Sequence, residues 1–279
     1  VQDPASGSMY YWNVETGETT WDAPAAFTPS PQPAAAQSTS GAAAEIKISD
    51  DYKVIENCAE FFLDSFWEHS TSMGPQSFNA AQKRELLECQ RKDLQDRYGK
   101  LVGERKLKSN LLLVQDKTGS IQACCGIEVS VVDKDDITVL SRERGENMLK
   151  GGLSALGGRA RNELRKAPLI EVADAVLPEN YGLIPVLSNL AVSQASRGSG
   201  LGRKLCQECE QIVKSWGFRE IFLLVEEQNV VARRLYESLG YQTIWNRPVE
   251  TVRVCNPNST GSCLELRPVP TIAMVKQIF

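Results

Sequence analysis

From residue 45 onward, apolar positions alternate between the spacing of strands and the spacing of helices. Phenylalanines and other apolar residues at helical spacing predict a helix over 52–66, with Asp50 or Asp51 as its N-cap. Further helices are expected over 79–98, from 202 to about 216, and after Asn229. Apolar runs bounded by turn signals predict strands over 45–49, 111–116, 121–133, 187–193 and 219–225. Strands and helices in this order describe one α/β domain over 45–279.

Residues 1–24 form a separate unit of turns and aromatic residues. Two short aromatic strands flank a Glu-Thr-Gly-Glu turn. This unit resembles the last two strands of a WW domain, a small sheet that binds proline-rich peptides. The resemblance implies a proline-binding face made by Tyr10, Trp12 and Trp21. The first strand of such a domain would fall upstream of Val1, so we expect the sequence to start partway through it; a frayed tail is the alternative.

Two segments interrupt the globular pattern. Residues 25–44 are rich in Ala, Pro and Ser with little charge, and such a composition buries too little apolar surface to offset its ordering entropy. They predict a disordered linker, in which Pro29–Pro33 is a plain spacer or a ligand for the WW-like unit. Residues 134–183 carry paired glycines and several arginines. They predict a mobile solvated loop, or one that closes over an anionic cofactor or an acidic substrate.

Composition narrows the class of protein. The 279 residues are 42% hydrophobic and 7% aromatic, as in soluble globular proteins. A formal net charge of -4 argues against nucleic-acid binding, which needs clustered Lys and Arg. No apolar run reaches the roughly 20 residues that span a bilayer. We expect a soluble protein with neither nucleic acid nor membrane as partner, and any targeting peptide would lie upstream of Val1.

The 8 cysteines are scattered and do not form a disulfide framework. Four of them lie in apolar strand or helix patterns, and we interpret them as buried small hydrophobic residues without a metal role. These are Cys124, Cys125, Cys206 and Cys209. Cys255 and Cys263 flank a turn near the C-terminus, which leads to the hypothesis of a redox-sensitive bridge across a hairpin.

The most specific signal lies between Leu187 and Tyr241. An apolar strand leads into Arg197-Gly198-Ser199-Gly200-Leu201-Gly202 and then into a helix. The unpaired N–H groups at a helix N-terminus, approached over glycines, hold a pyrophosphate. By itself this motif also fits dinucleotide binding. The second half of the Leu187–Tyr241 segment distinguishes between these kinds of site. Its strand is followed by Asn229, then by Leu235-Tyr236 and Gly240-Tyr241, a spacing that has no role in dinucleotide binding.

This combination resembles the acetyl-CoA-binding core of GNAT-family N-acetyltransferases, and its details are most similar to plastid and cyanobacterial members. The resemblance implies a mixed, mostly antiparallel sheet flanked by helices, with strands 187–193 and 219–225 splayed at the cofactor. Segment 134–183 is then an insertion. It also implies that acetyl-CoA is the co-substrate and that no metal takes part. The implied cofactor-binding residues are Leu190, Ala191, Val192, Arg197, Gly198, Ser199, Gly200, Leu201, Gly202, Arg203, Asn229 and Tyr236.

Acyl transfer needs a proton for the departing thiolate and a neutral amine. Tyr236, at the Leu-Tyr position, is the expected general acid. Asn229 either caps a helix or bonds the cofactor arm. Glu226 is the candidate base, and water relayed by Ser188 or Asn189 is an alternative. The only histidine, His69, is expected in a loop after the first helix. Glu171 and Asp174 are further candidates for the base.

The expected activity is acetyl transfer to a primary amine of a protein, either an N-terminal α-amine or a Lys ε-amine. A small amine, such as an arylalkylamine or a polyamine, is the alternative acceptor. A third hypothesis is an interaction scaffold, in which the WW-like unit recruits proline-rich partners and the acetyltransferase fold is inactive. The resemblance to plastid members leads us to expect a location in the plastid stroma, with cytoplasm or nucleus as the alternative.

Overall fold

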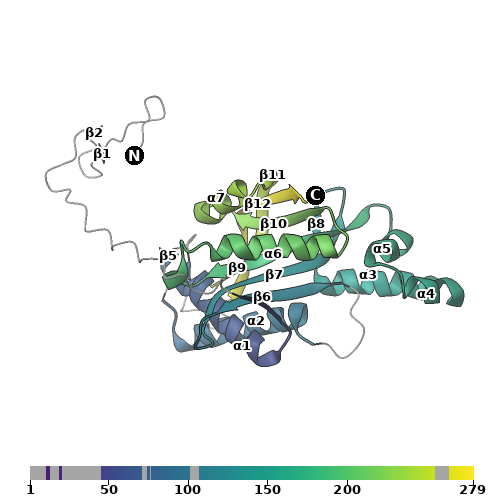
Figure 1. Ribbon diagram of the computed structural model, residues 1–279, viewed down its shortest axis with the longest axis horizontal. Helices are drawn as coiled ribbons and strands as arrows, with labels where there is room; N and C mark the ends of the chain where they lie inside the picture. The colour runs from purple at the N-terminus through teal and green to yellow at the C-terminus, as the bar shows by residue number, and fades with distance from the viewer. Residues whose placement is uncertain are drawn as a thin grey trace. The chain divides into compact units, whose positions relative to one another are not determined.

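The computed structural model describes residues 11–12, 19–20, 45–70, 74–75, 77–100, 107–254 and 264–279. The chain divides into two compact units, residues 1–43 and 44–279 (Figure 1). In the first, β1 (Tyr11–Trp12) pairs antiparallel with β2 (Thr19–Thr20). Tyr10, Trp21 and the expected linker 25–44 lie outside the described residues.

The second unit is built on a sheet with the strand order β11-β12-β10-β9-β7-β6-β3, and β8 pairs with β7 beside this path. Only β9 and β10 run parallel; the other described pairs are antiparallel. The expected mixed, mostly antiparallel sheet is therefore confirmed. Its strands are β3 (Ile46–Ser49), β6 (Ser109–Gln115), β7 (Ile121–Asp133), β8 (Thr138–Val139), β9 (Tyr181–Val192), β10 (Glu220–Glu226), β11 (Gln242–Val254) and β12 (Leu264–Gln277).

Helices α1 (Tyr52–Leu63) and α2 (Ala80–Tyr98) cover one face of the sheet. Asp51 caps α1 by accepting hydrogen bonds from the N–H groups of Lys53 and Val54, so one of the two expected caps is confirmed. The helix expected over 52–66 ends earlier. It continues as a π-helix, η1 (Asp64–Glu68), which leads into a small hairpin of β4 (His69–Ser70) and β5 (Gly74–Pro75).

The opposite face of the sheet carries α6 (Leu201–Ser215), which lies across the strands in Figure 1. Alternation along the strands separates the two cores, because successive side chains point to opposite faces. Leu111 and Leu113 are buried with α1 and α2, whereas Leu112 and Val114 are buried with α6. The remaining elements near this end are η2 (Gln194–Ser196), a short 3₁₀ turn, and α7 (Val230–Ser238).

The segment 134–183 is not the mobile loop that its glycines predicted. It holds β8 and three helices, α3 (Arg142–Ala155), α4 (Gly158–Leu164) and α5 (Leu169–Val176), and β9 begins already at Tyr181. Leu149 and Leu153 are buried one helical turn apart, which gives α3 an apolar face. Gly152 lets α5 approach, since a Cβ there would lie 2.6 Å from the Cβ of Val176. Gly152 thus serves helix packing rather than mobility.

Candidate functional site

The parallel strands β9 and β10 separate at their carboxyl ends. Their pairing covers only Val186 with Phe222 and Leu187 with Leu223. Beyond that point β9 stays paired with β7, and β10 stays paired with β12. The edges formed by residues 188–192 and 224–226 therefore face each other without a shared ladder. This opening is the splay that the sequence led us to expect.

A β-bulge reshapes β9 at this opening. Gly126 pairs with Ser188 and Cys124 with Ala191, so two residues of β9 lie opposite one residue of β7. Asn189, with φ of 53°, is the residue that takes up the left-handed conformation. The bulge resets the alternation, so that Leu190 packs on the α6 side while Ala191 packs on the α1–α2 side. The only sequence signal for it was an asparagine inside an apolar strand.

The glycine-rich turn leads from β9 into α6. Gly198 and Gly200 adopt φ of 78° and 85°, values that favour glycine. Gly200 is the N-cap of α6 and provides no side-chain hydrogen bond to the first turn, so an anion can take the place of a cap there. Gly202, by contrast, has no positive φ. Its role is packing, because a Cβ there would lie 3.3 Å from Leu235 Cδ2 on α7.

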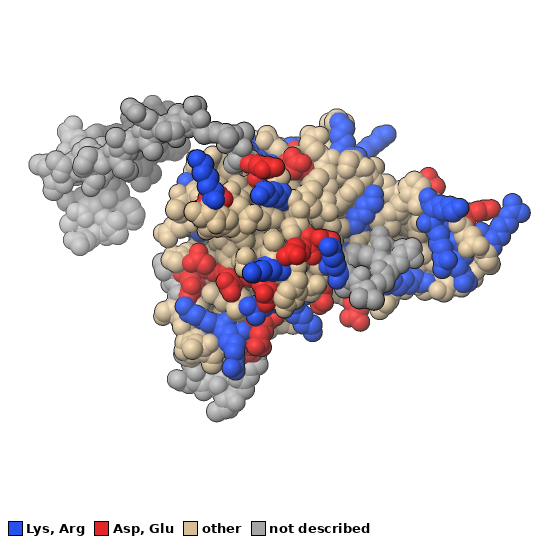
Figure 2. All heavy atoms as spheres, turned by 60° about the horizontal axis from the view of Figure 1, so that its bottom comes forward, with Lys and Arg blue, Asp and Glu red and all other residues tan. Residues whose placement is uncertain are grey.

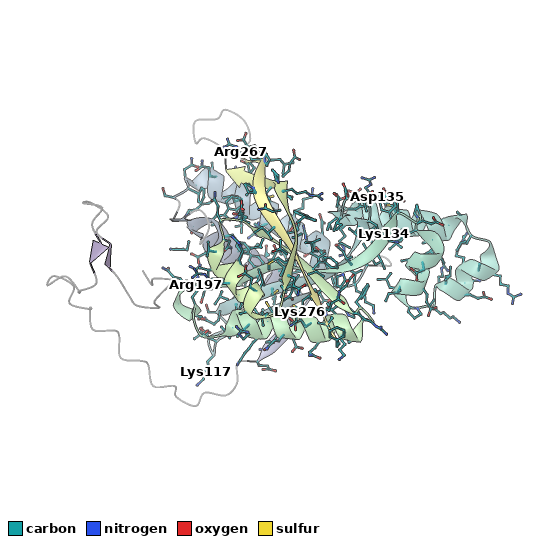
Figure 3. All side chains as sticks on the ribbon, turned by 90° about the horizontal axis from the view of Figure 1, so that it is seen from above. Lys117, Lys134, Asp135, Arg197, Arg267 and Lys276 are labelled. Carbon is teal, nitrogen blue, oxygen red and sulfur yellow. The ribbon has the colours of Figure 1, made fainter. Side chains whose placement is uncertain are left out.

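Two of the expected phosphate ligands also hold the site together. Arg197, labelled in Figure 3 at the start of α6, donates to the backbone oxygens of Val192 at 3.3 Å and His69 at 3.1 Å. Arg203 donates to Ser238 Oγ at 2.7 Å and so links α6 to α7. Both contacts are exposed, which leaves these cations at the surface of the turn.

His69 lies in strand β4 rather than in the expected loop, and its backbone oxygen contacts the glycine-rich turn through Arg197. Its Nδ1 is 2.9 Å from Asp64 Oδ1, and both side chains are about half exposed. The pair spans the π-helix η1 from its first residue, Asp64, to its C-cap, His69, and such irregularities are frequent at functional sites. The segment after the first helix is thus part of the rim of the opening.

Asn229 acts as the N-cap of α7. Its side-chain oxygen accepts a hydrogen bond from the N–H of Ala232 at 3.2 Å. Of the two roles considered from the sequence, the structure shows capping. The cap sets the direction of α7 and thereby the position of Tyr236 two turns later.

Tyr236 is buried behind the opening, with its ring 5.7 Å from that of Tyr241. Burial raises its pKa well above the ordinary value, and the neighbouring thiols of Cys206, Cys125 and Cys209 add to the effect. The phenol is therefore protonated at neutral pH. A protonated phenol at this position can donate its proton to a leaving group.

The described cysteines are free thiols, and those at 124, 125, 206 and 209 are fully buried. The interpretation as small buried hydrophobic residues is confirmed. Cys125 Sγ lies 3.8 Å from Cys209 Sγ, and Cys124 Sγ lies 3.6 Å from Cys58 Sγ. Cys255 and Cys263, for which a bridge was considered, lie outside the described residues.

The carboxylates considered as bases lie in different places. Glu226 is the last residue of β10, on the side of the strand opposite the one that packs against α6. Glu171 and Asp174 are exposed on α5, at the end of the molecule where β9 begins rather than where it opens (Figure 1). The structure therefore brings Glu226 to the opening and places Glu171 and Asp174 away from it.

An apolar pocket lies on the same side of the sheet as Glu226. Trp245 forms one wall, and Arg247 covers this ring with its guanidinium carbon 4.3 Å from the ring centroid. Arg247 also donates to Thr138 Oγ1 at 3.1 Å, which ties β11 to the β8 turn. The pocket is lined by Ile137, Val139, Ile184, Val186, Phe222, Leu223, Leu224, Trp245 and Ala273.

Charged groups are distributed unevenly over the surface. In Figure 2, blue side chains gather over the α3–α5 helices at the right of the molecule, where Lys150, Arg159, Arg165 and Lys166 are exposed. Within the described residues, no group of three or more His, Cys, Asp or Glu side chains is placed to hold a metal ion. No helix among these residues has the length and apolar character to cross a membrane.

Two family models match the chain. Residues 176–241 match the Acetyltransferase (GNAT) family, and residues 1–24 match the WW domain. The first match runs from the end of α5 through β9, α6, β10 and α7 to Tyr241. The chain thus contains a GNAT acetyltransferase domain preceded by a WW match, as the resemblances indicated.

Two chloroplast proteins of Arabidopsis thaliana are similar to part of the chain. GCN5-related N-acetyltransferase 10 is 32% identical over 65 residues, which are 23% of this chain and 25% of that protein. GCN5-related N-acetyltransferase 4 is 34% identical over 61 residues, which are 22% of this chain and 21% of that protein. The chain thus spans only 21–25% of the length of the curated relatives it matches.

Solved structures of similar proteins include a protein described as an acetyltransferase from Salmonella typhimurium, determined with its cofactor acetyl-CoA. It has a TM-score of 0.41 and 13% identity, and the match covers 85% of this chain and 95% of that one. The mosquito arylalkylamine N-acetyltransferase like 5b has a TM-score of 0.41 and 15% identity, with 85% and 100% covered.

Proposed function

We propose that this chain transfers the acetyl group of acetyl-CoA to a primary amine of a protein, preferentially an N-terminal α-amine. The observation that carries the proposal is the opening between β9 and β10, which stands directly beside the uncapped N-terminus of α6. The family match over residues 176–241 covers both features. Donor and acceptor would meet in this opening.

The donor would bind along β9 and the turn that follows it. The backbone of Leu190, Ala191 and Val192 forms an unpaired edge toward β10, so it can pair with the amide groups of the pantetheine arm. The pyrophosphate would take the place of the missing cap on α6, where N–H groups and the helix dipole favour an anion. Arg197 and Arg203 are the cations nearest to this turn in sequence, and both are exposed.

The chemistry would be direct acyl transfer. The amine nitrogen attacks the thioester carbonyl carbon, the new C–N bond forms, and the C–S bond breaks. Tyr236, whose buried phenol is protonated at neutral pH, would give its proton to the departing thiolate. Backbone N–H groups on the open edge of β9 would stabilise the carbonyl oxygen as it becomes negative. Glu226, at the end of β10, is our candidate for accepting the amine proton, directly or through water.

The preference for an α-amine follows from the pKa of the acceptor. An α-amino group has a pKa of about 7.7–8.0, so a fair fraction is already neutral at neutral pH. A Lys ε-amine, near about 10.4, would require roughly 3–4 kcal/mol more to lose its proton.

The WW match at residues 1–24 supports a second binding function in the same chain. In this proposal Tyr10, Trp12 and Trp21 bind a proline-rich segment of the substrate protein or of a partner. Recruitment by a WW unit would raise the local concentration of an acceptor at the acetyltransferase domain. A WW-linked scaffold with an inactive domain is the competing hypothesis.

The test is CoA release by the full chain from acetyl-CoA with three kinds of acceptor. These are peptides with a free N-terminus and no lysine, matched peptides with a blocked N-terminus and one lysine, and small amines such as an arylalkylamine and a polyamine. The proposal expects the fastest turnover with the free N-terminus. Faster turnover of small amines would favour the alternative acceptor, and no CoA release with any amine would contradict an enzymatic function.

A further inference from the structure

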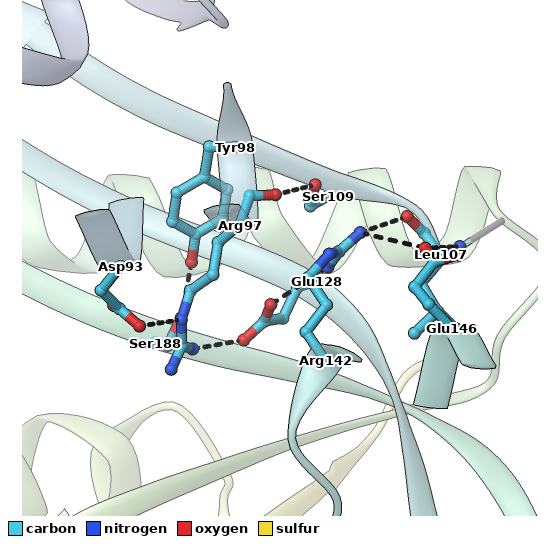
Figure 4. A network of polar contacts seen from close by, with 9 residues as sticks. All are labelled: Asp93, Arg97, Tyr98, Leu107, Ser109, Glu128, Arg142, Glu146 and Ser188. Atoms are coloured by element: carbon cyan, nitrogen blue, oxygen red, sulfur yellow. Dashed lines mark hydrogen bonds and ion pairs between the residues drawn. The ribbon is translucent and has the colours of Figure 1, made fainter. Parts of the chain in front are cut away.

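Two hydroxyl groups from distant parts of the chain meet at the opening. Ser188 is the first residue of β9 beyond its last pair with β10. The Oγ of Ser188 lies 2.8 Å from the Oη of Tyr98, the last residue of α2, as Figure 4 shows. Tyr98 is only 3% exposed, whereas Ser188 is partly exposed. The pair therefore connects the buried end of α2 to the surface of the opening.

A glycine provides the room for this contact. A Cβ on Gly126 of β7 would lie 2.0 Å from Tyr98 Oη, far inside the contact distance of two atoms. Gly126 pairs with Ser188 across the two strands. Any larger residue at 126 would displace the phenol from the serine.

Partly buried ion pairs hold the end of α2 in place. Arg97 donates to Glu128 on β7 at 2.6 Å and to Asp93 at 2.8 Å (Figure 4). Glu128 is also bound by Arg142 of α3 at 3.2 Å. Ser109 Oγ donates to the backbone oxygen of Arg97 at 2.6 Å. Tyr98 is thus fixed on both sides by groups with defined partners.

The protonation state of Tyr98 determines whether Ser188 Oγ is free to accept a further hydrogen bond. Burial raises the pKa of Tyr98 well above its ordinary value, and the charge of Glu128 adds to this. The phenol therefore keeps its proton and can donate it to Ser188 Oγ, since a phenol is a better donor than an aliphatic hydroxyl. This hydrogen bond holds Ser188 in one orientation and leaves a second lone pair on its oxygen for another donor.

We propose that Ser188 is a catalytic residue that accepts an N–H hydrogen bond from the acceptor amine, and that Tyr98 positions it. The inference rests on the acetyl transfer proposed above and deepens it. As the C–N bond forms and the C–S bond breaks, the amine proton passes to a water molecule bound at Ser188 Oγ, and through water to Glu226, the acceptor proposed above, which returns it to solvent. The thiolate takes its proton from Tyr236, and the phenolate left behind regains a proton from solvent before the next turnover, so protons and charges balance. Ser188 orients the nucleophile and is not itself ionised.

A neighbouring group supports a ligand at this place. The side-chain Nδ2 of Asn189 is buried and has no hydrogen-bond partner among the residues that the structure describes. A buried amide donor without an acceptor is unfavourable by about 1–3 kcal/mol. A carbonyl oxygen of the bound donor or acceptor would supply that acceptor beside Ser188.

The experiment compares Ser188→Ala, Ser188→Thr, Tyr98→Phe and Gly126→Ala in the full chain. Tyr52→Phe is the matched control, because Tyr52 is 61% exposed at the start of α1. The loss of one hydrogen bond predicts a fall of roughly tenfold in kcat/KM for the acceptor peptide in Ser188→Ala. Affinity for acetyl-CoA, followed by calorimetry, should stay unchanged. Ser188→Thr keeps the hydroxyl and should recover most of the activity, while Tyr98→Phe and Gly126→Ala should resemble each other.

Three results would overturn the inference while wild-type turnover stands. One is an unchanged kcat/KM for the acceptor in Ser188→Ala. The second is an equal loss in Ser188→Ala and Ser188→Thr, which would mark a structural role of the strand. The third is a loss of acetyl-CoA affinity that accounts for the whole effect. Absence of turnover in the wild type would instead contradict the proposed function itself, so the two failures are distinguishable.

Discussion

The role of Tyr236 as general acid gives the sharpest prediction for the chemistry. Tyr236→Phe removes one oxygen from a side chain that is 6% exposed and lies on α7 beside the opening. Because burial excludes bulk water from this position, solvent is a poor substitute for the phenol as proton donor. General acid catalysis typically contributes about 10²–10⁴-fold, which corresponds to roughly 2.7–5.4 kcal/mol of barrier. We expect kcat to fall at least hundredfold, with little change in acetyl-CoA affinity.

The assay is CoA release at saturating acceptor, together with the affinity for acetyl-CoA and the thermal unfolding temperature of each variant. Tyr241→Phe is a matched control, because its ring contacts that of Tyr236. Its hydroxyl is buried without a hydrogen-bond partner in the described part of the chain. Removing an unsatisfied hydroxyl should leave activity intact and stability equal or slightly higher. A Tyr236→Phe variant with wild-type kcat, or equal losses in both variants, would refute the assignment.

Three further predictions concern the architecture around the site. Glu128→Gln removes the charge of a carboxylate that is 6% exposed and bound by two arginines. We expect the free energy of unfolding to fall by about 3–5 kcal/mol and the unfolding temperature to fall by roughly 6–20 °C. A fall of less than 1 °C would contradict this expectation. Asn189→Gly keeps the left-handed backbone and removes the side-chain amide, so its unfolding temperature should resemble that of the wild type. Asn189→Leu should have a clearly lower unfolding temperature, because leucine disfavours this backbone conformation. Equal unfolding temperatures of the two variants would count against a strained bulge. Burial holds the pKa values of the buried tyrosines 98, 236 and 241 above the ordinary value near 10. Their contribution to stability is therefore complete below pH 10 and is lost as pH rises further, because only the unfolded chain then releases these protons. The measurement is thermal unfolding combined with tyrosinate absorbance from pH 7 to 11. Ionisation should accompany unfolding, and ionisation without unfolding would contradict the prediction.

Local signals in the sequence predicted much of the fold. Asp51 caps α1 and Asn229 caps α7 because an N-cap depends only on the residues of one helical turn. The glycine-rich turn could also be predicted from the sequence, because Gly198 and Gly200 adopt backbone angles that glycine favours. Segment 134–183 was interpreted wrongly. Its glycines indicated a loop. The burial of Leu149 and Leu153 stabilises a helix there, because tertiary packing overrides the low helix propensity of glycine.

Outside segment 134–183 the sequence by itself determined the order of elements from β3 to α7, the glycine turn before α6 and the position of Tyr236 on α7. These features depend on residues that are close in the chain, so local propensity and spacing are sufficient to find them. Only the tertiary structure decided which side chains share the opening. Tyr98 and Ser188 are 90 positions apart, and they meet because α2 ends over β7 at a glycine and β9 bulges at Asn189. Contacts of this kind follow from strand register and helix packing, which no local pattern encodes.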